Sequence, residues 1–156
     1  RTERLEEDEF SQPGDAVVLV IGMGRVGTGA YDMFRQNLEK KVCGVEVDRH
    51  KVSAHSQKGR HVIAADAEDP EFWEHINLKS IELVMLSMPN YLDILEVVKQ
   101  LQNASYTGKT AGIARYEDEK HKLLASGIDV VFDFYVEAGA GFADQSLQML
   151  DQQITK

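Results

Sequence analysis

A glycine-rich hexapeptide, placed between an apolar run and a helical pattern, constrains the fold of this chain more than any other feature. Residues 16–21 are all apolar, and a helical pattern of apolar residues extends from Val26 to Lys40. In a strand–turn–helix unit, the first glycine allows a sharp turn, the second lets a phosphate approach the backbone, and the third lets the helix pack against the sheet. Free N–H groups of the first helical turn then face the anion. The sequence therefore predicts a phosphate-binding turn formed by Gly22, Met23, Gly24, Arg25, Val26 and Gly27.

A carboxylate near the end of the second strand completes a dinucleotide-binding fingerprint. The predicted strand over 42–47 leads into Glu46-Val47-Asp48, and Glu46 lies about twenty residues beyond the glycines, where such a carboxylate binds the adenosine ribose. Asp48 either assists Glu46 or caps the helix predicted over 49–58, since aspartate is favoured at that position. A carboxylate here disfavours a 2′-phosphate, so NAD, AMP or ATP is expected rather than NADP.

Strands and helices alternate along the rest of the chain. Strands are predicted over 61–65, 81–88, 110–114 and 128–132, and helices over 71–77, 90–101, 116–126 and 141–154. The predicted buried helix faces are Val26, Ala30, Phe34 and Leu38 in the first helix, and Leu92, Leu95, Val98 and Leu101 over 90–101. The alternation predicts an α/β, Rossmann-like doubly wound parallel sheet of about six strands with helices on both faces.

Composition excludes several classes of protein. The net charge of −9 argues against nucleic-acid binding, and no run of about twenty apolar residues suggests a membrane span. The single cysteine, Cys43, is expected to be a small buried hydrophobe. Residues 1–15, with the acidic run Glu6-Glu7-Asp8-Glu9, are predicted to be a linker or tail, and residues 16–156 a single domain. Because the chain starts at Arg1, we expect it to be a piece of a longer protein.

No catalytic constellation stands out in the sequence. The five histidines lack metal-ligand spacing. The acidic cluster Asp66, Glu68 and Asp69 fits a cation site or, more simply, a helix-capping turn, because Pro70 follows directly and suits the first helical position. We therefore predict no catalytic residue and no metal site, and the chain is not expected to be an enzyme.

These motifs together resemble a known family. The sequence Ile21-Gly22-Met23-Gly24-Arg25-Val26-Gly27, the Glu46-Val47-Asp48 strand end, Asp66-Ala67 followed by Asp69-Pro70-Glu71, the strand Leu83–Leu86 and the pair Ala114-Arg115 occur in the order typical of TrkA-N, or RCK (regulator of K⁺ conductance), domains. The resemblance covers residues 17–154 and is closest to the cytoplasmic domains of Kef-type glutathione-regulated potassium-efflux antiporters.

The resemblance implies a regulatory module that binds NAD(H) or AMP, forms homodimers and controls a membrane transporter at the cytoplasmic face of the inner membrane. By matching motifs, Gly22, Gly24, Arg25 and Val26 are implied to lie at the phosphates, Glu46 at the ribose, Asp66 and Ala67 beside the adenine, and Ser87 and Arg115 on the far side of the crevice. The predicted cofactor-binding set is completed by Met23, Gly27, Val47, Asp48 and Met88.

Alternatives to this interpretation remain at the level of sequence. The chain could instead be the cofactor-binding domain of a soluble NAD-dependent oxidoreductase, or a dimerisation module with an empty site. The apolar stripe Leu147, Leu150 and Ile154 is predicted either to form a subunit contact or to pack on its own sheet.

Overall fold

The computed structural model describes residues 12–154, with side chains as far as Asp151. The predicted acidic run over 6–9 lies outside the described residues. The elements are β1 (Val18–Ile21), α1 (Arg25–Gln36), β2 (Val42–Glu46), α2 (Arg49–Gln57), β3 (Val62–Ala64), α3 (Pro70–Glu74), a 3₁₀ turn (Leu78–Ser80), β4 (Leu83–Leu86), α4 (Tyr91–Asn103), β5 (Lys109–Ala114), α5 (Glu117–Ala125), β6 (Val130–Asp133) and α6 (Phe134–Ile154).

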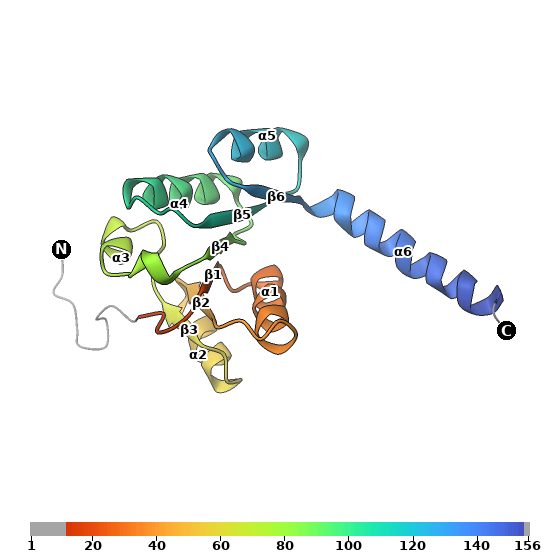
Figure 1. Cartoon of the computed structure of the whole chain (residues 1–156), viewed down its shortest axis with the longest axis horizontal. Coiled ribbons are helices and arrows are strands. Elements are labelled where there is room, and N and C mark those ends of the chain that lie inside the picture. Colours follow the sequence, from red (N-terminus) through yellow and green to blue (C-terminus); the bar gives the residue numbers. More distant parts are fainter. Residues whose placement is uncertain (1–11, 155–156) are drawn as a thin grey trace.

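The six strands form one parallel sheet in the order β3-β2-β1-β4-β5-β6. β2 and β3 therefore follow one another on one side of β1, and β4, β5 and β6 follow one another on its other side. Figure 1 shows α1 and α2 on one side of the sheet and α3, α4 and α5 on the other. The predicted Rossmann-like doubly wound sheet is confirmed.

The larger core lies between the sheet and the α3–α5 layer. Leu19, Cys43 and Val84 of the central strands are fully buried there against Ile94 and Val97 of α4. A smaller cluster on the other face packs β1 and β2 against α1. Strands buried on both faces read as continuous apolar runs, which is why the strand positions were visible in the sequence.

The predicted helix faces were partly wrong. Leu38 lies beyond the end of α1 and is 53% exposed, and Leu92 in α4 is 57% exposed. Gly27 and Tyr31 are the buried residues of α1 instead. The Tyr31 hydroxyl accepts a hydrogen bond from the backbone N–H of His61 (2.6 Å), and this contact helps to fix which side of the helix faces the sheet.

The last helix departs most from the sequence prediction. α6 begins at Phe134 rather than at 141, directly after β6, and it projects away from the sheet (Figure 1). Every described side chain from Tyr135 to Asp151 is exposed, including Leu147 and Leu150 at 56% each. The alternative that these two leucines pack on their own sheet is therefore wrong. Among residues 12–154, no helix is long and apolar enough to cross a membrane.

Candidate functional site

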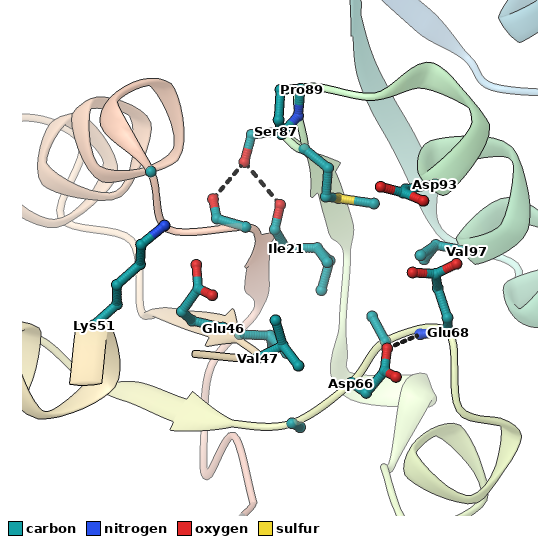
Figure 2. A pocket seen from close by; sticks show the side chains of 16 residues that line it. Ile21, Glu46, Val47, Lys51, Asp66, Glu68, Ser87, Pro89, Asp93 and Val97 are labelled. Carbon is teal, nitrogen blue, oxygen red and sulfur yellow. Dashed lines mark hydrogen bonds between the residues drawn. The ribbon is translucent and has the colours of Figure 1, made fainter. Parts of the chain in front are cut away.

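A cavity of about 320 Å³ opens at the carboxyl ends of the strands, between β1 and β4 (Figure 2). After β1 the chain turns to one face of the sheet, and after β4 it turns to the other face. The two loops therefore diverge and leave a crevice where ligands of this fold class bind. The lining residues are Ile21, Gly22, Gly24, Val45, Glu46, Val47, Lys51, Ala65, Asp66, Ala67, Glu68, Ser87, Met88, Pro89, Asp93 and Val97.

The glycine turn forms one wall of the cavity, and its three glycines have different surroundings. Gly22 has a φ of +90°, which a side chain would strain. A Cβ atom at Gly24 would meet nothing within 4 Å, so this position is open to a ligand. A Cβ atom at Gly27 would lie 1.9 Å from the Gly22 carbonyl oxygen. Gly27 is thus required for close packing of α1, as predicted, whereas phosphate binding at the turn stays a prediction.

Glu46 holds the turn and the β2–α2 loop together. Its Oε1 accepts the Met23 backbone N–H (3.1 Å) and its Oε2 accepts the Asp48 backbone N–H (2.9 Å). The residue is 8% exposed and lines the cavity, and each oxygen can accept a second hydrogen bond. The carboxylate is therefore held where a ribose hydroxyl could donate to it.

Asp48 acts as the cap of α2. Its Oδ1 accepts the backbone N–H groups of His50 (2.9 Å) and Lys51 (3.4 Å), and it does not line the cavity. Of the two roles left open by the sequence, capping is the one that the structure supports. Asp69 likewise caps α3 through the Glu71 N–H (2.9 Å), so it is the helix-capping residue of the acidic cluster.

The other predicted residues divide into two groups. Val47, Asp66, Ala67, Ser87 and Met88 line the cavity together with Gly22, Gly24 and Glu46. Met23, Arg25, Val26, Gly27, Asp48 and Arg115 do not line it. The Met23 side chain is buried at 2% exposure, and a Cβ atom on Gly44 would lie 2.7 Å from it. The Met23 side chain therefore belongs to the core and not to the cavity wall.

Ser87 and Arg115 are held by protein groups. The Ser87 hydroxyl lies 2.8 Å from the Ile21 carbonyl oxygen and 2.7 Å from that of Gly22, so it donates back to the turn. The Arg115 guanidinium donates to the Pro89 carbonyl (3.0 Å) and lies 5.3 Å from the Phe134 ring centroid. Arg115 thus joins the loop that lines the cavity to the first residue of α6.

Lys51, Glu68 and Asp93 also line the cavity, and sequence reasoning missed them. Glu68 and Asp93 approach from the α3 and α4 side (Figure 2). Burial raises the pKa of Glu68, as do the neighbouring carboxylates of Asp93, Asp66 and Glu96. The available signal for Lys51 was its position three residues after the Asp48 cap, in the first turn of α2 and close to the end of β2 in sequence.

A series of hydrogen bonds links Asp32, Arg60 and His55 to the backbone of the glycine turn. Arg60 binds Asp32 with two hydrogen bonds (2.9 and 3.0 Å), and its Nη1 lies 3.2 Å from Nδ1 of His55. The other ring nitrogen of His55 lies 2.9 Å from the Met23 carbonyl oxygen. Because the guanidinium only donates, Nδ1 accepts and Nε2 donates to the turn. His55 therefore positions the turn rather than binding a metal.

Two further features bear on chemistry. Within residues 12–154, no group of three or more His, Cys, Asp or Glu side chains is placed to hold a metal ion. Cys43 is fully buried in the central sheet, and burial raises the pKa of its thiol to about 12. It packs as the small hydrophobe that the sequence predicted.

Solved structures similar to this chain share its fold. The NAD(P)-binding domain of an exopolyphosphatase-related protein from Archaeoglobus fulgidus has a TM-score of 0.78 and 19% identity, over 85% of this chain and 98% of that one. The TrkA-N domain of the inner membrane protein ybaL from Escherichia coli has a TM-score of 0.71 and 19% identity, over 82% and 94%. The AMP-bound C-terminal domain of Kef from Shewanella denitrificans has a TM-score of 0.68 and 16% identity, over 85% and 80%.

Comparison at the level of sequence identifies the family. Among curated protein sequences, none matches the chain. The TrkA-N domain family matches residues 18–133, which run from the first residue of β1 to the last residue of β6. The sheet, the glycine turn and the cavity described above all lie within this stretch, and the chain belongs to the TrkA-N domain family.

Proposed function

We propose that this domain binds an adenine nucleotide, AMP or NAD(H), and thereby controls a potassium-efflux (K⁺/H⁺ antiport) transporter. The observation that carries the proposal is the cavity between β1 and β4, where an open glycine turn faces a buried carboxylate. The AMP-bound Kef domain and the NAD(P)-binding domain of similar fold support the choice of ligand.

The residues of the cavity match the parts of an adenylate. The phosphate lies at the N-terminus of α1, where Gly24 leaves room and the capping position makes no side-chain hydrogen bond. The ribose hydroxyls donate to Glu46. The base lies against Val47 and Ala67, with Asp66 at its edge. Glu46 would repel a 2′-phosphate, so NADP is excluded from this arrangement.

Titration calorimetry with AMP, NAD, NADH and ATP tests the proposal. We expect wild-type protein to bind at least one of them, and Gly24→Val to lose binding because its side chain enters the space of the phosphate. Gly29→Val is the matched control, because Gly29 lies on the same helix outside the cavity, also with nothing within 4 Å of a Cβ atom. Undiminished affinity in Gly24→Val would overturn the phosphate assignment. Hydride transfer from bound NADH to a second substrate would favour an oxidoreductase instead.

Homodimerisation is the second part of the proposal, and an uncovered half of the sheet supports it. Parallel pairing places Met85, Ala111 and Val130 in one row across β4, β5 and β6. Ile113 and Phe132 form the next row. Each row is half-buried in β4 and β5 and exposed in β6, where Val130 is 60% and Phe132 47% exposed. This is the face that α1 and α2 cover over β1–β3, and no described helix covers it over β6.

The helix that could cover this face projects away from it. α6 exposes Tyr135, Val136, Phe142, Leu147, Met149 and Leu150, each by more than half of its surface. Its interior Gly139 and Gly141 each lower helix stability by about 1 kcal/mol relative to alanine. A helix of this kind needs tertiary contacts to be stable. In the proposed dimer, each copy lays α6 over the open β4–β6 face of the other, an isologous exchange.

Sedimentation velocity tests the dimer. We expect wild-type protein to sediment as a dimer at micromolar concentration, and Leu147→Asp to sediment as a monomer. Leu92→Asp on α4 is the matched control, because Leu92 is equally exposed, at 57% against 56%, but lies on the other side of the sheet. A monomeric wild-type protein, or equal effects of the two substitutions, would contradict the exchange.

Regulation requires a connection between the cavity and the dimer. The Arg115 guanidinium provides one, since it binds the Pro89 carbonyl in the cavity wall and stacks on Phe134 at the start of α6. A nucleotide that favours one position of this loop therefore also favours one direction of α6. The transporter responds through a shift between two dimer arrangements. This function places the domain at the cytoplasmic face of the inner membrane, with the transporter in the same polypeptide.

A further inference from the structure

Among the described residues that line the cavity, Lys51 is the only basic one. It lies in the first turn of α2, whose backbone is fixed by the Asp48 cap. Figure 2 shows its side chain extending along the cavity wall, with the ammonium directed toward the glycine turn and away from Asp66 and Glu68. Within the part of the chain that the structure describes, no carboxylate lies within ion-pair distance of this ammonium.

The charges around Lys51 divide the cavity into two ends. Glu68 and Asp93 lie together at the far end with Asp66, and the raised pKa of Glu68 reflects burial as well as their mutual repulsion. Glu46 uses both of its oxygens on backbone N–H groups beside the turn. An anionic ligand group would therefore be repelled over most of the cavity. The turn, where the Lys51 ammonium adds to the positive end of α1, is the exception.

We propose that Lys51 binds the phosphate of the ligand and selects adenylates over the uncharged nucleoside. This assignment rests on the proposed nucleotide function and adds a residue to it. The ammonium is a compact donor on a flexible stem, so it can reach a phosphate oxygen that the main-chain amides leave free. It also orients the ligand, because a phosphate at the opposite end would meet the carboxylates of Glu68 and Asp93.

Paired titrations with AMP and adenosine test this role. We expect Lys51→Met to bind AMP roughly tenfold more weakly, as for loss of one charge-assisted hydrogen bond at a partly hydrated site. Adenosine affinity stays within about twofold of wild type, because base and ribose contacts are unchanged. Lys58→Met is the matched control, since it removes the same charge from the opposite end of α2, outside the cavity. Lys51→Arg, which keeps the charge, retains most of the AMP affinity.

The outcomes separate this inference from the function on which it rests. A loss of AMP affinity in Lys51→Met alone, with a shallower dependence of AMP affinity on salt, supports the phosphate contact. Equal losses of AMP and adenosine, or equal behaviour of Lys51→Met and Lys58→Met, overturn it while the wild-type site stands. Failure of wild-type protein to bind any adenine nucleotide overturns the proposed function itself.

Discussion

Alanine substitutions at two glycines of α1, two residues apart, should change stability in opposite directions. At Gly27, a Cβ atom would lie 1.9 Å from the Gly22 carbonyl oxygen and 2.8 Å from the Ser87 hydroxyl oxygen. Both obstacles are fixed, since the first is backbone and the Ser87 hydroxyl is bonded to the turn. At Gly29, a Cβ atom would meet nothing within 4 Å. The local helix propensity is the same, so the difference between the variants isolates the packing of α1 on β1.

The magnitudes follow from three effects. Forcing a methyl group into this contact costs about 1–3 kcal/mol or more, and breaking the Ser87 hydrogen bond costs about 1 kcal/mol further. Replacing glycine in a helix gains about 1 kcal/mol. The last two effects cancel for Gly27→Ala, so we expect it to lower the free energy of unfolding by about 1–3 kcal/mol, and Gly29→Ala to raise it by about 1 kcal/mol.

Urea denaturation followed by circular dichroism measures both changes. For a domain of this size, the loss in Gly27→Ala corresponds to a decrease in Tm of roughly 2–12 °C. Equal stabilities of the two variants would refute the inference that Gly27 is required for packing. It would also mean that α1 can move away from the turn without cost, so the geometry assigned to the phosphate site would lose its basis.

Two further predictions concern titratable groups. The Arg60 hydrogen bonds lower the pKa of Asp32 below its ordinary value of 3.8, so the pair stabilises the fold above that pH and its contribution is lost as the pH falls through the folded-state pKa. Asp32→Asn should therefore lower the free energy of unfolding by about 1 kcal/mol at pH 7, as measured by urea denaturation. It should also make the free energy of unfolding less dependent on pH below about pH 4, and an unchanged pH profile would contradict this. Cys43, buried with a pKa of about 12, should react with a thiol reagent at pH 8 only as fast as the protein unfolds; rapid labelling of native protein would show that β2 is accessible.

The sheet and the turn could be predicted because each depends on local sequence. Buried parallel strands are apolar runs, and the glycines occur where the backbone needs them, as the φ of +90° at Gly22 and the close contact at Gly27 show. Strand ends of a parallel sheet share one edge, so the positions of Glu46, Asp66 and Ser87 at the ends of their strands were enough to place them together.

The parts that were missed depend on tertiary geometry. Glu68 and Asp93 reach the cavity because of how the chain packs around α3 and α4, which spacing alone does not reveal. Arg115 was expected to line the cavity, but its guanidinium is held by the Pro89 carbonyl and the Phe134 ring. The early start of α6 was missed because aromatic and β-branched residues at 134–136 favour a strand, whereas the structure continues them from β6 directly into a helix.

The two hydrogen bonds accepted by Glu46 have a consequence for the energetics of ligand capture. The glycine turn and the β2–α2 loop are already held together by the protein's own groups, through the backbone N–H groups of Met23 and Asp48. The entropic cost of ordering these loops therefore arises when the protein folds and not when a ligand binds. For the proposed nucleotide ligand, this preorganisation makes a slow ordering step on binding unnecessary. Shortening Glu46 to aspartate would loosen the two loops before it removed the acceptor.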